Sequence, residues 1–153
     1  MKDQLHRHRE QSLNGTAMMA TVHCLSGCAI GEVAGMVIGA ALGWNNAETI
    51  ALAIVLAFLS GYFLTMLPIL RAGYSYGAAA RIALASDTTS ITIMEVVDNL
   101  MMMIPGAMNA PLDSLLFWSS LAIALVIAGV AAFPVNRWLI ARGRGHAVVH
   151  MHH

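Results

Sequence analysis

The chain has 153 residues, of which 58% are hydrophobic and only 10% are charged, and its mean hydropathy is +0.70. An ordinary soluble domain carries about 25% charged residues, so this composition argues against a water-soluble protein and predicts an integral membrane protein. The formal net charge is +0, which offers no basic excess for nucleic acid, and two cysteines are too few for a secreted disulfide framework.

Four apolar segments follow a polar start. Residues 1–16 mix both charges and are too polar for a signal peptide, so we expect a cytoplasmic N-terminal segment. A bilayer-spanning helix needs about 20 apolar residues. Four segments meet this length, at about 17–43, 47–70, 80–104 and 115–135. They predict an all-α integral membrane fold with four transmembrane helices, in a domain at 17–137.

The basic residues predict how these helices are oriented. The loops at 44–48 and 105–114 contain no Lys or Arg. Positively charged loops stay on the cytoplasmic side, so we expect a multi-pass protein of the bacterial inner (plasma) membrane with both termini in the cytoplasm. The basic residues fall into three groups: Lys2, Arg7 and Arg9; Arg71 and Arg81; Arg137, Arg142 and Arg144.

The first span carries a glycine at every fourth position. On a helix this spacing leaves one face without side chains, where a neighbouring backbone can approach closely. The glycine ridge is compatible with packing inside the chain and equally with the seam of a homo-oligomer. The ridge consists of Gly27, Gly31, Gly35, Gly39 and Gly43.

Potential metal ligands lie on the same helix. Cys24, Cys28 and Glu32 are one turn apart and share a face, with His23 about 100° around from Cys24. Two thiolates one turn apart suit Cu(I), or Zn(II) if an imidazole joins them. The alternative is a pair of small apolar thiols packed between helices.

Acidic residues lie inside the spans without a nearby basic partner in the sequence: Glu32, Asp87, Glu95 and Asp98. Ionisable groups at bilayer depth are costly and usually mark ion or proton pathways. Asp87, Met94, Asp98 and Met101 fall on one stripe of the third span, flanked by Ser90, Glu95 and Met102. The opposite face, which we expect to meet lipid, holds Ile93, Val96, Val97, Leu100 and Ile104.

These carboxyl groups allow a second interpretation. They can be protonated and bonded to neighbouring polar side chains, for which Thr88, Ser90 and Asn99 are the candidates. A hydrated path open to cations is the interpretation that we favour, because the acidic side chains follow one face of a helix.

Methionines and histidines extend the set of candidate ligands beyond the bilayer centre. Met101, Met102 and Met103 end the third span near the outer side, Met108 follows in the outer loop, and Met36 lies at a comparable depth on the first span. We assign Met94, Met101 and Met102 as outer ligands for a soft cation. The tail at 138–153 is rich in histidine and would bind copper or zinc in the cytoplasm. Its candidate ligands are His146, His150, His152 and His153.

Three sequence elements resemble those of a known bacterial family. The HCLSGC-x2-GE element from His23, the TTS-x3-MEVVDN element from Thr88 and the GHAVVH tail from Gly145 are similar to those of uncharacterised polytopic membrane proteins with a domain of unknown function. The resemblance implies the same four-span body and supplies no activity. A looser resemblance to high-affinity copper importers rests on the outer methionines and the glycine-ridged helix, although those importers have three spans.

The sequence therefore predicts soft-metal transport or homeostasis, with copper as the first candidate ion and zinc as the second. We expect a homo-oligomer without enzymatic activity that passes its ion to a cytoplasmic acceptor. The alternatives are a redox protein with haem on His23 or metal on the carboxylates, a cation or proton channel without preference for soft metals, and a scaffold subunit.

Overall fold

The structure is a computed structural model that describes residues 2–103 and 106–142, with side chains for 12–103 and 106–142. This part of the chain folds into four long helices and one short 3₁₀ helix, which confirms the predicted all-α class. The elements are α1 (Lys2–Leu42), α2 (Asn46–Arg71), α3 (Tyr76–Met103), η1 (Ala107–Asn109) and α4 (Leu115–Ala141).

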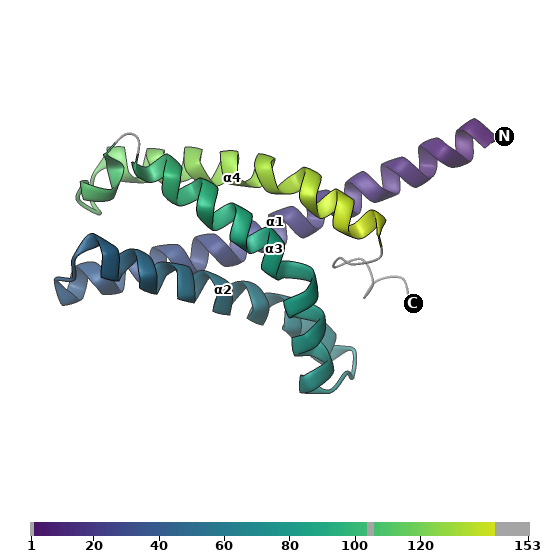
Figure 1. Ribbon diagram of the computed structural model, residues 1–153, viewed down its shortest axis with the longest axis horizontal. Coiled ribbons are helices and arrows are strands. Elements are labelled where there is room, and N and C mark those ends of the chain that lie inside the picture. Colours follow the sequence, from purple (N-terminus) through teal and green to yellow (C-terminus); the bar gives the residue numbers. More distant parts are fainter. Residues whose placement is uncertain (1, 104–105, 143–153) are drawn as a thin grey trace.

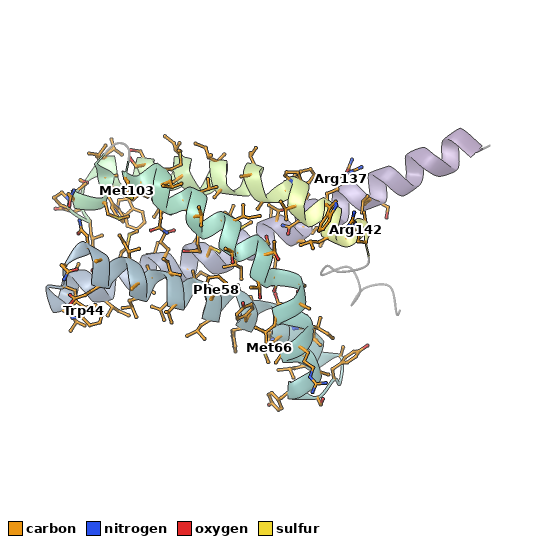
Figure 2. All side chains as sticks on the ribbon, viewed as in Figure 1. Trp44, Phe58, Met66, Met103, Arg137 and Arg142 are labelled. Atoms are coloured by element: carbon orange, nitrogen blue, oxygen red, sulfur yellow. The ribbon has the colours of Figure 1, made fainter. Side chains whose placement is uncertain are left out.

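The chain runs back and forth along one long axis. Figure 1 shows α1 beside α2 and α3 beside α4, with the α1–α2 turn and η1 at one end of the molecule. The α2–α3 turn and the last turns of α4 lie toward the other end, and α1 projects beyond the bundle there. Figure 2 places Trp44 and Met103 at the first end, and Arg137 and Arg142 at the second.

The turn between α1 and α2 is encoded locally. Gly43 adopts the left-handed conformation (φ 66°), and the Trp44 amide donates to the Gly39 carbonyl at 2.9 Å, which closes α1 in a Schellman motif. Asn45 then caps α2 and forms a capping box with Glu48. The predicted break between the spans at 17–43 and 47–70 is therefore correct.

Helix lengths differ from the expected spans at two places. Helix α1 begins at Lys2, so residues 2–16, for which we predicted a cytoplasmic segment, continue the helix of the first span. Helix α4 continues past residue 135 and includes Pro134. Residues 2–16 contain no proline, so nothing in them interrupts the backbone hydrogen bonds of α1.

Four of the five glycines of the ridge pack against α2 of the same chain, and the fifth, Gly43, lies in the turn after α1. A Cβ atom at Gly27 would lie 2.6 Å from the Gly61 Cα, and one at Gly35 would lie 2.7 Å from the Ala53 Cβ. The hydroxyl of Ser60 donates to the Gly27 carbonyl at 2.6 Å. Of the two interpretations of the ridge, the structure supports packing within the chain, because α2 already occupies this face.

Three of the helices contain segments long and apolar enough to cross a membrane: Ser12–Leu42, Asn46–Arg71 and Leu115–Ala141. Helix α3 has 28 residues, about 42 Å at 1.5 Å per residue, so its length is sufficient. Its hydropathy is lowered by Arg81 and by the acidic residues predicted to line a pathway. The acidic residues that would line a pathway are therefore among the residues that lower the hydropathy of α3 as a candidate span.

Candidate functional site

One face of α1 carries the potential ligands found in the sequence. Cys24, Cys28 and Glu32 are each at most 2% exposed, and successive members lie about 6 Å apart along the helix axis. Both cysteines are free thiols. Because the helix repeat of 3.6 residues returns every fourth residue to nearly the same side, these groups form a row directed into the bundle.

The facing row comes from α3. Asp87, Ser90, Glu95 and Asp98 are all at most 4% exposed, whereas Val96 and Leu100 on the other side are more than half exposed. This confirms that the acidic stripe faces inward. Ile93 and Val97, which we expected to face lipid, instead pack against the core cluster around Cys24 and Cys28.

The two rows meet side chain to side chain. Cys24 lies beside Ser90 and within electrostatic reach of Asp87. Cys28 lies beside Glu95 one level further along, and the carboxyl groups of Glu32 and Asp98 face each other at the next level. We call this arrangement the α1–α3 row; it consists of Cys24, Cys28 and Glu32 with Asp87, Ser90, Glu95 and Asp98.

Asp87 occupies a polar environment at one end of this row. Thr65 of α2 donates a hydrogen bond to its Oδ2 atom, and Ser86 donates to its Oδ1 atom at 2.7 Å. A carboxylate that accepts bonds from two hydroxyl groups is well solvated by the protein. The Asp87 carboxyl is thus held in place by its neighbours.

The other carboxyl groups differ from Asp87. Both side-chain oxygens of Glu32, both of Asp98 and one of Glu95 are buried without a hydrogen bond of regular geometry among the described residues. Burying a carboxylate without a partner costs several kcal/mol. Two facing carboxyl groups must share a proton or a cation, because two adjacent negative charges in a dry site repel each other strongly.

Two of the three polar side chains predicted as partners of these carboxyls, Thr88 and Asn99, form hydrogen bonds with other groups. Thr88 donates to the Leu84 carbonyl at 2.6 Å and lies 2.8 Å from the Tyr62 hydroxyl. Asn99 donates to the backbone carbonyl of Glu95 at 2.9 Å. The hydroxyl groups bonded to Asp87 come from Thr65 and Ser86, which we had not singled out.

The methionines divide between two levels. Met94 packs in the same core cluster as Cys24 and Cys28, so it belongs with the thiols and not with the outer ligands. Met36 and Met102 share a second cluster near η1, against which Met101 and Met108 pack. Thioethers from α1, α3 and η1 are therefore gathered beyond the Glu32–Asp98 level.

Of the remaining candidate ligands, His23 alone lies among the residues whose side chains are described. His23 is half-buried on α1. Within residues 12–103 and 106–142, no three side chains of His, Cys, Asp or Glu converge in a geometry suited to one metal ion. The tail histidines, His146, His150, His152 and His153, lie outside the described residues.

The potential ligands of this site are spread along a row and are not gathered around a single point. Thiols, carboxyls and thioethers follow one another along the α1–α3 contact, and two facing groups meet at each level. A family model described as a domain of unknown function (DUF4396) matches residues 14–145, which include the whole row. Searches of curated proteins and of solved structures gave no match.

Proposed function

The chain belongs to the DUF4396 family, a domain of unknown function, and from its own side chains we propose that it moves a soft metal cation, with copper as the first candidate, across the bacterial inner membrane. Helix α3 would be the fourth span, and the ion would travel along the α1–α3 row. The ion is the cargo of the protein and not a resident cofactor.

The observation that carries this proposal is the pairing of the two buried rows. Three carboxyl groups with unsatisfied oxygens lie on the α1–α3 contact, and the thiols of Cys24 and Cys28 continue the same line. A passing cation would supply the charge that these carboxyl groups lack. The successive groups are about 6 Å apart, so an ion would step from one level to the next.

Ligand softness favours copper over a hard cation. Thiols and thioethers prefer Cu(I), whereas carboxylates alone would suit Mg²⁺ or Ca²⁺. In the row the two thiols lie at the end near Asp87 and the methionine cluster lies at the end near η1. An ion would thus meet weak neutral sulfur donors first, then the carboxyls, then the stronger thiols, which corresponds to inward movement.

The distribution of the arginines agrees with inward movement of the ion. The arginines with described side chains lie toward the ends of α2, α3 and α4 away from η1, as the positive-inside rule would require for a cytoplasmic face: Arg71, Arg81, Arg137 and Arg142. The histidines of the tail would receive the ion there and pass it to a cytoplasmic acceptor. Four helices enclose little space, so a homo-oligomer remains part of the proposal.

Uptake of Cu(I) into vesicles that contain the purified protein tests this function. Replacing both thiols (Cys24→Ser with Cys28→Ser) should lower the initial rate about tenfold or more, since a hydroxyl is a poor ligand for Cu(I). Asp113→Asn is the matched control, because Asp113 is an exposed carboxyl outside the row. Wild-type vesicles that take up no more Cu(I) than empty ones would refute the proposal.

The facing carboxyls of Glu32 and Asp98 favour one competing function, a proton path without preference for soft metals. In that case vesicles with an imposed pH gradient would conduct protons without Cu(I). The double cysteine variant would conduct normally, whereas Glu32→Gln would stop the current. Proton flux that depends on Glu32 but is indifferent to the cysteines would replace metal transport as the function.

A further inference from the structure

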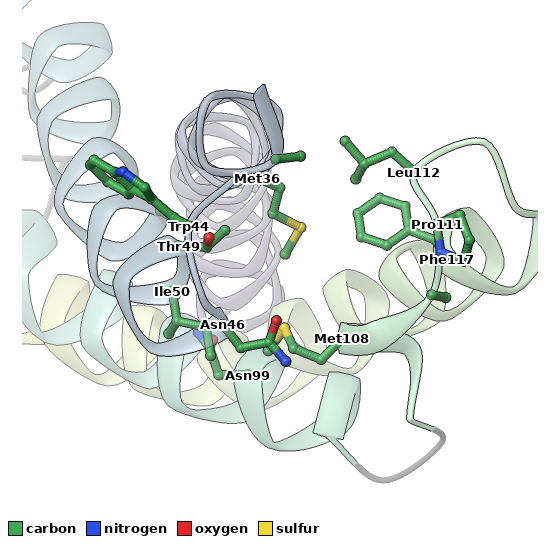
Figure 3. A pocket seen from close by; sticks show the side chains of 13 residues that line it. Met36, Trp44, Asn46, Thr49, Ile50, Asn99, Met108, Pro111, Leu112 and Phe117 are labelled. Atoms are coloured by element: carbon green, nitrogen blue, oxygen red, sulfur yellow. The ribbon is translucent and has the colours of Figure 1, made fainter. Parts of the chain in front are cut away.

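A cavity of about 200 Å³ lies at the end of the bundle near η1. Residues from α1, α2, α3, the η1 region and α4 line it, among them Met36, Trp44, Asn99, Met108 and Phe117 (Figure 3). Since a water molecule occupies about 30 Å³ in the liquid, the cavity has room for an ion with part of its hydration shell.

Two methionines from distant parts of the chain line this cavity. Met36 is contributed by α1 and is buried, and Met108 is contributed by η1. The short 3₁₀ helix is fastened over the cavity, since the side chain of Asn46 at the start of α2 donates to Asn109 Oδ1 at 2.6 Å. Met108 is therefore positioned by a specific contact.

The lining is chemically selective. Among the described residues around the cavity no Asp, Glu, Lys, Arg or His occurs, so its electron-pair donors are the two sulfurs and neutral oxygens. A hard divalent cation would lose much of its hydration energy here and gain no carboxylate in return. A soft monovalent cation loses less and is bound well by thioethers.

Two residues that line the cavity come next after members of the α1–α3 row along α1 and α3. Met36 follows Glu32 by one turn of α1, and Asn99 follows Asp98 directly on α3. The Asn99 amide donates to the Glu95 carbonyl at 2.9 Å, which fixes its orientation at the boundary between cavity and row. An ion released from the two sulfurs would next meet the facing carboxyls of Glu32 and Asp98.

We propose that this cavity is a capture site for a soft monovalent cation, Cu(I) or its analogue Ag(I), with Met36 and Met108 as the thioether ligands. The site rests on the proposed transport function and adds to it the step that selects the ion before it enters the row. Its neutral donors bind the ion loosely enough to release it toward the carboxyls.

Ag(I) uptake by vesicles that contain the full-length protein measures the capture step. Met36→Leu with Met108→Leu keeps the apolar volume and removes both sulfurs. We expect the Ag(I) concentration for half-maximal uptake to rise about tenfold or more, with the maximal rate retained. Met103→Leu is the matched control, since Met103 lies at the same end of α3 but is 62% exposed and does not line the cavity.

A second measurement uses the wild-type protein and does not depend on how well the variants fold. Hydrogen peroxide converts thioethers to sulfoxides, and mass spectrometry gives the rate at each methionine. Bound Ag(I) should slow oxidation of Met36 and Met108 and leave Met103 unchanged. Equal rates with and without Ag(I) at Met36 and Met108 would overturn the capture site.

The two proposals fail in different ways. If the double methionine variant takes up Ag(I) like the wild type while the double cysteine variant does not, the capture site is wrong and transport along the row stands. If wild-type vesicles show no uptake and peroxide oxidation is unaffected by Ag(I), both are wrong. Protection of Met36 and Met108 without uptake would support the site and refute transport.

Discussion

Identical functional groups have different environments in this protein. Asp87 accepts hydrogen bonds from Thr65 and Ser86, whereas neither oxygen of Asp98 has such a donor in the described part of the chain. The first carboxyl is stabilised by the protein itself. The second requires a proton or a cation, so substitution at the two positions should have different effects on stability.

We predict that Asp87→Asn destabilises the protein and that Asp98→Asn does not. An amide at position 87 would turn a donor toward the hydroxyl groups of Thr65 or Ser86, at a cost of about 1–3 kcal/mol. At position 98 the neutral amide removes a desolvated carboxyl, so stability should be retained while cation uptake is lost. Denaturation in detergent and vesicle uptake measure the two effects. A stable Asp87→Asn together with an unfolded Asp98→Asn would contradict this interpretation.

At the scale of helices, α1 and α2 are held together by backbone approach. A Cβ at Gly31 would collide with the backbone of Leu56 and Ala57, whereas nothing lies within 4 Å of a Cβ at Gly15 on the same helix. Backbone atoms in the middle of a helix cannot move aside as a flexible side chain can. The α1–α2 contact is therefore intolerant of even one methyl group.

We predict that Gly31→Ala lowers the free energy of unfolding by about 1–3 kcal/mol because it forces the helices apart. Gly15→Ala is the control and should raise stability by about 0.5–1 kcal/mol, since alanine loses less conformational freedom in a helix. Thermal unfolding of the two variants in one detergent gives both values. Equal effects of the two substitutions would show that α1 and α2 are not closely packed at Gly31.

A polar contact joins α1 to α4 at the arginine-bearing end. The buried side chain of Asn136 donates to Thr21 Oγ1 at 2.9 Å, and Thr21 in turn donates to the Ala17 carbonyl at 2.8 Å. Thr21→Val should cost about 0.6 kcal/mol, the average for an interhelical bond in a membrane protein. A double-mutant cycle with Asn136→Ala measures the coupling between the two side chains, and additive effects would mean that this contact contributes nothing.

At the scale of the whole molecule, the topology depends on α3. If α3 crosses the bilayer, the loop that carries Asp113 and the turn that carries Tyr74 lie on opposite sides. Both residues are exposed, and the native cysteines are buried, so a cysteine introduced at either position would be labelled selectively.

We predict that a membrane-impermeant maleimide labels Asp113→Cys in intact spheroplasts and labels Tyr74→Cys only after the membrane is broken. The expectation follows from the basic residues near Tyr74 and their absence from residues 105–114. Labelling of both positions from outside would show that α3 does not cross the membrane. The reverse pattern would invert the proposed orientation and the direction of ion movement.

Several features of this protein follow from the sequence alone. The apolar lengths predicted four long helices, and the spacing of Cys24, Cys28 and Glu32 predicted one inward face of α1. The order of Asp87, Glu95 and Asp98 likewise predicted the buried face of α3. These predictions succeed because side-chain direction along a helix is set by its repeat, which is a local property.

Only the tertiary structure decided how those faces are paired. It assigned the glycine ridge to α2, gave Asp87 its partner Thr65 from another helix, and brought Met36 and Met108 to one cavity. None of these contacts has a signal in local periodicity, because they depend on which helices are neighbours and at what relative height. The sequence determined the face on which each group lies, and the packing of the helices determined which group it meets.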